Sequence, residues 1–343
     1  MNDRNSPVRR RSRRSVLAAG GALSAVGLAG CSGLLTAAEG ERADVAASFF
    51  TFFDFARTIT AETPVTVENL VPVGMHGHGW EPDASVTRAI IDADVFVHVG
   101  EGFQPWADRA IRTAKDDGAD TAFVNVRDGI ELLDVAASLD EDEAVADGKD
   151  PHFWLDPLRS KTAVDNVEAG LAAAYPNHAE TFAANADALR SELDVIHEEY
   201  RAVFADPPRD QVVLAAHNAF QYLGARYDVA MNPLVFNLAA EGDVPPEAIT
   251  RAARLVAEND IEYIAAAVFE SHRPARQLIE ETRVKQYYPV TPYAGTLEQW
   301  VERGWGYAEI ARRINMPTFE IVLGKTPPAE TVHADYDGGT ESL

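Results

Sequence analysis

The chain has 343 residues, of which 46% are apolar and 24% are charged, so it is long enough for two domains and is neither fibrous nor mainly disordered. Its formal net charge of −24 excludes nucleic-acid binding, because such a surface repels the phosphate backbone. Only 5 of the 30 basic residues are lysine. An acidic, lysine-poor surface stays soluble at high salt, where screening weakens its self-repulsion, so the composition predicts an extreme halophile as the source.

Residues 1–30 predict an export signal rather than part of the fold. Six arginines precede a short, glycine-containing apolar run that is too weak to span a membrane. The pair Arg13-Arg14, before Ser15-Val16-Leu17, resembles a twin-arginine signal, which exports folded proteins. The run ends at Leu28-Ala29-Gly30-Cys31, which resembles a lipobox and predicts a lipid on Cys31. A buried structural cysteine is the alternative, and as the single cysteine it forms no internal disulfide.

After a tether at residues 31–42, residues 43–177 predict an N-terminal α/β lobe. Apolar runs alternate with amphipathic stretches, as expected of a parallel sheet with helices on its faces. The predicted strands are 44–50, 65–70, 95–99 and 121–125, and the predicted helices are 53–59, 82–93, 106–115 and 157–175. Residues 140–150 form a predicted acidic loop.

Residues 178–205 predict one long linking helix. Apolar residues recur there in steps of four and three, which places them on a single face. At roughly 1.5 Å per residue the helix is about 40 Å long, enough to span two domains.

Residues 206–325 predict a second α/β lobe. The predicted strands are 212–215, 261–269 and 287–290, and the predicted helices are 219–225, 246–258, 274–282 and 307–314. Residues 326–343 form a predicted loose, polar tail. The predicted fold class is therefore α/β, with two Rossmann-like lobes joined by one long rigid helix.

Three histidines occupy loops where α/β proteins bind ligands. His78 follows a predicted strand, His152 lies in D-P-H-F-W-L-D-P, and His217 follows the first strand of the second lobe. Imidazole is the commonest side-chain ligand for borderline metals. One isolated histidine usually has a structural role, but two in one lobe and a third in the other favour a metal site in a cleft between the lobes.

These motifs resemble the zinc and manganese solute-binding lipoproteins of ABC importers. The resemblance covers Val71–Pro82, which reads V-P-x-G-x-x-x-H-x-x-E-P, then Asp150–Pro157 and His217–Phe220. It implies two α/β lobes, one rigid helix and a single metal in the interlobe cleft. It also implies that His78, His152 and His217 are ligands and that an ABC permease with its ATPase receives the metal.

The fourth ligand departs from the family pattern. An aspartate often stands in the turn where this chain has Thr291-Pro292-Tyr293-Ala294-Gly295. Glu270, which matches a family glutamate close to the site, or water is expected to complete the shell. Of the other histidines, His98 is expected in the core, and His333 is expected on the surface with His178 and His197.

Three neutral imidazoles favour zinc over manganese, which prefers oxygen ligands. We therefore predict a zinc carrier that is not an enzyme, acts as a monomer and is lipid-anchored outside the cell, with a manganese carrier as the alternative. A secreted zinc hydrolase is a weaker alternative, because the chain has neither His-Glu-x-x-His nor Gly-x-Ser-x-Gly. A purely adhesive lipoprotein would leave the three histidine motifs unexplained.

Overall fold

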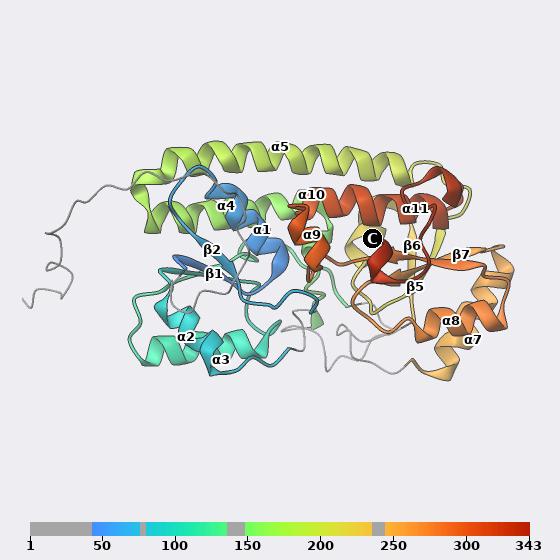
Figure 1. The fold of residues 1–343 in the computed structure, drawn as a ribbon, viewed down its shortest axis with the longest axis horizontal. Helices are drawn as coiled ribbons and strands as arrows, with labels where there is room; N and C mark the ends of the chain where they lie inside the picture. The colour runs from blue at the N-terminus through green and yellow to red at the C-terminus, as the bar shows by residue number, and fades with distance from the viewer. Residues whose placement is uncertain (1–42, 76–79, 136–147, 235–243) are drawn as a thin grey trace, which may run out of the picture. The chain divides into compact units, whose positions relative to one another are not determined.

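The fold is built on two parallel β-sheets (Figure 1). The computed structural model describes residues 43–75, 80–135, 148–234 and 244–343. The first sheet has the order β2-β1-β3-β4 and the second has the order β6-β5-β7-β8. All neighbouring strands in both sheets are parallel. The predicted α/β fold class is confirmed.

The first sheet lies between two pairs of helices (Figure 1). Along β3, Val95 and Val97 enter the main core while Phe96 enters a smaller cluster with Trp106. This alternation shows that both faces of the sheet are covered. The strands are β1 (Val45–Ala47), β2 (Val67–Asn69), β3 (Val95–His98) and β4 (Ala122–Asn125). The helices are α1 (Phe50–Ile59), α2 (Ala84–Asp92), α3 (Pro105–Asp116) and α4 (Pro157–Ala174).

The second sheet is covered in the same way, with α11 against β7 and β8 and with α7 packed beside α8. Its strands are β5 (Gln211–Ala215), β6 (Ala230–Pro233), β7 (Tyr263–Ala267) and β8 (Gln286–Val290). Its helices are α6 (Gln221–Tyr227), α7 (Pro246–Glu258), α8 (Arg273–Glu281), α9 (Glu298–Glu302), α10 (Tyr307–Ile310) and α11 (Met316–Val322). A π-helical turn at Ala311–Asn315 joins α10 to α11.

The helix α5 (Ala179–Phe204) contacts both lobes. It packs against α1 and α4 in the first lobe and against α6, α10 and α11 in the second. The predicted apolar stripe is the buried face, with Leu189 only partly buried. The other members of the stripe are Phe182, Ala186, Leu193, Ile196, Tyr200 and Val203.

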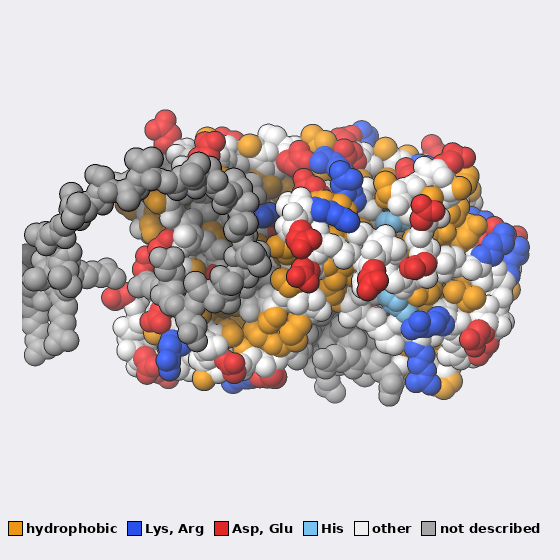
Figure 2. Space-filling view, viewed as in Figure 1, with side chains coloured by type: hydrophobic (Ala, Val, Ile, Leu, Met, Phe, Trp, Pro, Cys, Tyr) orange, Lys and Arg blue, Asp and Glu red, His pale blue; other side chains and the backbone are white. Residues whose placement is uncertain are grey.

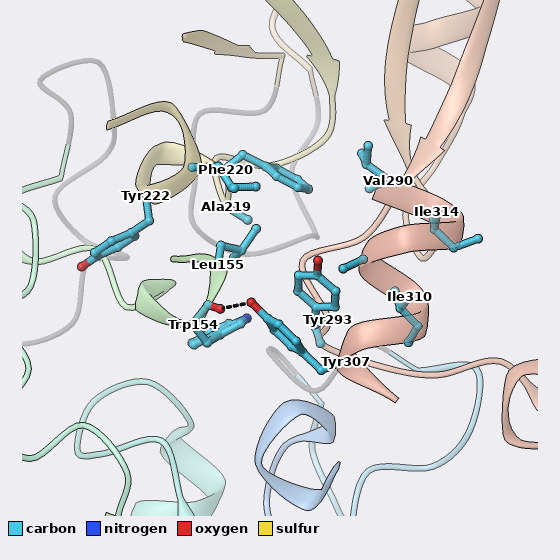
Figure 3. Packing of buried hydrophobic residues seen from close by; sticks show 14 of the residues in the cluster. Trp154, Leu155, Ala219, Phe220, Tyr222, Val290, Tyr293, Tyr307, Ile310 and Ile314 are labelled. Atoms are coloured by element: carbon cyan, nitrogen blue, oxygen red, sulfur yellow. Dashed lines mark hydrogen bonds between the residues drawn. The ribbon is translucent and has the colours of Figure 1, made fainter. Parts of the chain in front are cut away.

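Buried hydrogen bonds join the two lobes away from α5. Trp154 of the first lobe donates its indole N–H to the Pro292 carbonyl at 2.7 Å. Its own carbonyl accepts the Tyr307 hydroxyl at 2.8 Å, as Figure 3 shows. The Tyr307 backbone N–H donates to Asp54 Oδ2 at 2.8 Å. These groups are almost inaccessible to water, so each broken bond would leave a buried polar atom unsatisfied.

Several details differ from the sequence predictions. Proline 82 does not begin α2, because Asp83 is the N-cap and its carboxylate accepts the Ser85 backbone N–H. Strand β6 was not predicted, since its Ala-Met-Asn-Pro sequence has no apolar run and lies at a sheet edge.

The C-terminal segment is packed rather than loose. His333, expected on the surface, is 4% exposed, and its Nε2 donates to the Ile314 carbonyl at the π-helical turn. Tyr336 and Leu343 are also buried, and Gln299 donates to the Leu343 carbonyl. The polar composition of this segment did not predict the packing, because only His333, Tyr336 and Leu343 are buried in it.

Acidic side chains are scattered over the face drawn in Figure 2, and basic ones gather in a few places. Beyond residue 30 the chain has 53 acidic and 24 basic residues, a net charge of −29. Local ion pairs, such as those of Arg190 with Asp165 and Glu168, offset only part of the repulsion.

We therefore expect the melting temperature to fall when the protein is diluted out of molar salt. The Debye length grows from about 3 Å at 1 M to about 10 Å at 0.1 M, so more carboxylates repel one another. Thermal unfolding followed at several potassium chloride concentrations measures this effect, with sucrose as an uncharged control. A melting temperature that does not change over this range would contradict the prediction.

Candidate metal site

His217 and Glu270 lie at the carboxyl edge of the second sheet, where the connections from β5 and β7 leave in opposite directions. This position is where open α/β sheets bind ligands. Strand β5 ends two residues before His217, and β7 ends three residues before Glu270. Because β5 and β7 are neighbours, the two side chains meet, although 53 residues separate them.

The Glu270 carboxylate binds His217 with both of its oxygens. Oε1 accepts from the imidazole Nδ1 at 2.6 Å, and Oε2 accepts from the His217 backbone N–H at 2.9 Å. The imidazole is fully buried, and the Glu270 side chain is 4% exposed. A carboxylate that accepts at Nδ1 places the proton there and leaves Nε2 as the possible metal ligand.

Asp150 holds His152 in a similar way in the first lobe. Its Oδ1 accepts from both the His152 backbone N–H at 2.9 Å and the imidazole Nδ1 at 2.8 Å. The backbone of Asp150 is anchored in turn, because its N–H donates to Leu133 and its carbonyl accepts the Tyr222 hydroxyl. Asp150 and His152 are 0% and 1% exposed.

The rest of the D-P-H-F-W-L-D-P motif supports this arrangement. Residues Phe153–Leu155 form a single 3₁₀ turn that ends at Asp156. Asp156 caps α4 by accepting the Leu158 backbone N–H at 3.0 Å, and Pro157 begins the helix. Fully buried, Asp156 also pairs with Arg159 and Arg226. The motif therefore fixes both ends of the turn on which His152 lies.

The two histidines come together from different lobes. Their ring centroids are 5.3 Å apart, and the Trp154 ring lies 5.2 Å from that of His152. Burial and then the neighbouring His217 hold the pKa of His152 well below its usual value, so its imidazole is neutral at physiological pH. Among the described residues, neither His152 Nε2 nor Asp150 Oδ2 has a hydrogen-bond partner. A neutral, buried imidazole of this kind is suited to a metal ion.

His78 lies outside the described residues, as does His76. The chain leading toward them does approach the second lobe, because Gly74 donates its backbone N–H to the Thr296 carbonyl at 2.8 Å. A Cβ on Gly295 would collide with the Met75 carbonyl, so the close approach requires glycine there. Within the described part of the chain no group of three or more His, Cys, Asp or Glu side chains could hold a metal ion.

The turn at residues 291–295, where the resemblance led us to look for an aspartate, makes contacts with the other lobe. Pro292 accepts the Trp154 indole N–H, and the Tyr293 carbonyl accepts the Thr51 hydroxyl at 2.9 Å. Tyr293 has a φ of +57° and shares a 2.6 Å hydrogen bond between its hydroxyl and that of Tyr200. This turn therefore joins the lobes instead of supplying a carboxylate.

Asp150 was not predicted as a partner of His152. The available signal was its position two residues before His152, where an aspartate commonly accepts the backbone N–H two residues on. Glu270 was expected near the site, and both of its oxygens are used by His217; its direct metal ligation stays a prediction.

The model of the family described as zinc-uptake complex component A, periplasmic, matches residues 45–314. The chain belongs to this family. The matched region includes both sheets, α5 and all three histidine motifs. The predicted family is confirmed.

Individual relatives agree with this assignment. The zinc-binding protein AdcA of Streptococcus pyogenes is 28% identical over 88% of this chain, which spans only 61% of that relative's length. The high-affinity zinc uptake system protein ZnuA of Bacillus subtilis is 24% identical, over 80% of this chain and 86% of its own length.

A solved structure supports the fold. The Zn(II)-bound ZnuA-like domain of Streptococcus pneumoniae AdcA superimposes with a TM-score of 0.68 at 24% identity. The superposition covers 83% of this chain and 100% of that domain. The two-lobe α/β arrangement is therefore shared with a solved member of the ZnuA family.

Proposed function

We propose that this chain captures zinc outside the cell and delivers it to an ABC importer. The observation that carries the proposal is the pair of buried imidazoles, His152 and His217, which come from different lobes with their rings 5.3 Å apart. Each imidazole is oriented by a buried carboxylate at Nδ1. The zinc-binding names of the AdcA and ZnuA relatives point to the same cargo.

The proposed ligands are His78, His152 and His217 in the interlobe cleft. The metal would bind the two described imidazoles through Nε2, since their Nδ1 atoms face carboxylates. Water or Glu270 would take the fourth position. Because both Glu270 oxygens already accept from His217, the geometry favours water.

A nitrogen-rich shell favours zinc over manganese, and intrinsic affinities follow the same order. We expect the metal-free protein to bind zinc more tightly than manganese in calorimetric titrations at equal pH and salt. Calcium, which prefers oxygen ligands, serves as the control for nonspecific binding to the acidic surface. Tighter binding of manganese than of zinc would overturn the assignment of the cargo.

We further propose that the protein is exported through Arg13-Arg14, carries a lipid on Cys31 and works as a monomer at the outer face of the membrane. These three residues lie outside the described part of the chain. None of the helices in that part is long and apolar enough to cross a bilayer. A lipid on Cys31 would supply the membrane attachment.

The Cys31→Ser variant should therefore lose its membrane attachment while remaining folded. Each buried CH₂ of an acyl chain contributes about 0.8 kcal/mol, so loss of the lipid should move most of the protein to the soluble fraction. Cell fractionation with a high-salt wash measures this, and Ser32→Ala is the matched control. Equal membrane retention of the wild type and Cys31→Ser would contradict lipid anchoring.

The proposed role requires no catalysis. Asp150 and Glu270, the carboxylates beside the two histidines, are already hydrogen-bonded to them. A hydrolase would need a general base directed at a metal-bound water. Zinc-dependent cleavage of a reporter ester or phosphate would instead support the hydrolase alternative.

A further inference from the structure

Asp150 and Glu270 are equivalent in their chemistry although they belong to different lobes. Each is a buried carboxylate that accepts both the Nδ1 hydrogen and the backbone N–H of one histidine. Among the described residues neither of them forms an ion pair with Lys or Arg. Asp156, which is equally buried and only six residues from Asp150, pairs with Arg159 and Arg226.

A buried carboxylate without a basic partner is costly, because little solvent or countercharge compensates its charge. Two such groups beside two buried imidazoles therefore indicate that a positive charge completes this region. Histidine ligands bring no charge of their own, and the turn at Pro292 provides no carboxylate. A divalent ion held by histidines alone would leave a buried charge of about +2, which the two carboxylates would cancel.

We propose that Asp150 and Glu270 together neutralise a divalent ion held by the histidines and so make the site select divalent over monovalent cations. This inference rests on the proposed function, since it needs a metal at the histidines. The attraction between a carboxylate and a cation is proportional to the cation's charge. Neutralising either carboxylate should therefore weaken binding of a divalent ion more than binding of a monovalent ion.

The hydrogen bonds make Asp150→Asn the cleaner substitution. Asp150 uses only Oδ1 for both bonds to His152, so an asparagine oxygen can keep both while an NH₂ group replaces Oδ2. Glu270 uses both oxygens, so Glu270→Gln places an amide NH₂ against either the backbone N–H or Nδ1 of His217. Asp150→Asn therefore removes the charge and keeps both hydrogen bonds to His152, whereas Glu270→Gln removes the charge and also disturbs one hydrogen bond to His217.

The experiment compares Zn²⁺ with Ag⁺, a monovalent ion that also binds imidazole, by competition titrations in chloride-free buffer. We expect Asp150→Asn to weaken Zn²⁺ binding about 10- to 100-fold, the usual effect of losing a partner of a ligating histidine. Ag⁺ binding should weaken by a smaller factor, so the Zn²⁺/Ag⁺ affinity ratio should fall. The double variant with Glu270→Gln should lower that ratio further.

Asp54→Asn is the matched control, because Asp54 is a buried aspartate at the lobe junction that contacts neither histidine. It should lower the melting temperature and leave the Zn²⁺/Ag⁺ ratio unchanged. Equal weakening of both ions by Asp150→Asn, or no weakening of either, would overturn the charge-neutralising role. Failure of the wild type to bind zinc would instead overturn the proposed function. The visible spectrum of bound Co²⁺ should keep its shape in Asp150→Asn, and a changed shape would indicate a structural role instead.

Discussion

Zinc should raise the melting temperature of the wild-type protein and leave that of the His152→Ala variant nearly unchanged. A ligand that binds only the folded state stabilises it by about 4 kcal/mol at a free concentration 1,000 times its Kd. For a protein of this size that corresponds to a rise of roughly 10 °C. His152 and His217 lie in different lobes, so either alanine substitution should remove most of the rise. Thermal unfolding of metal-free protein with and without zinc measures it.

His333→Ala is the matched control for this experiment. His333 is buried like His152, but its Nε2 donates to the Ile314 carbonyl, away from the two site histidines. Its loss should lower the melting temperature with and without zinc and leave the difference between them unchanged. A full zinc-dependent rise in His152→Ala would show that the metal binds elsewhere.

The elements predicted most accurately are those in which buried apolar residues recur at regular intervals along the sequence. Helices α4, α5 and α7 agree with their predicted ranges to within about one residue, because each has a regular apolar face. The predicted boundary between β1 and α1 was wrong, because the strand was expected to run to Phe50 and ends at Ala47. The run Ser48-Phe49-Phe50 is apolar enough for a strand, but the chain turns at Phe49 and α1 begins at Phe50. Where a strand and the following helix are both fully buried, they have the same apolar composition, so the sequence does not show where one ends and the other begins.

The loop positions of His152 and His217 could be predicted because their motifs are local, but the contact between His217 and Glu270 could not. Glu270 meets His217 only after β5 and β7 pair in the second sheet. The role of Pro292 and Tyr293 also depends on contacts with the other lobe, which no spacing in the sequence reveals. Hydrogen bonds across such distances in sequence are set by the topology of the fold.

Trp154 packs in the core of the first lobe and also bonds to the second lobe, so we expect it to contribute strongly to stability. Its ring is completely buried and lies within 6 Å of the rings of Phe49, Phe52 and Phe103. Its indole N–H and carbonyl bind two groups of the other lobe, Pro292 and Tyr307. One residue therefore contributes through its ring to the core of the first lobe, and through its indole N–H and its backbone carbonyl to the junction with the second.

We expect Trp154→Ala to reduce the free energy of unfolding by about 3–5 kcal/mol, the usual cost of removing a large aromatic ring from a core. Trp154→Phe keeps most of the packing but leaves the Pro292 carbonyl without its donor, which should cost about 1–3 kcal/mol. Urea unfolding of the metal-free proteins measures both values. Trp305→Ala is the control, because Trp305 is a partly buried tryptophan that packs at the edge of the core. If Trp154→Ala cost no more than Trp305→Ala, the stability of the lobe junction would not depend on the Trp154 side chain, and its other contacts, such as the Asp54–Tyr307 and Thr51–Tyr293 hydrogen bonds, would be sufficient.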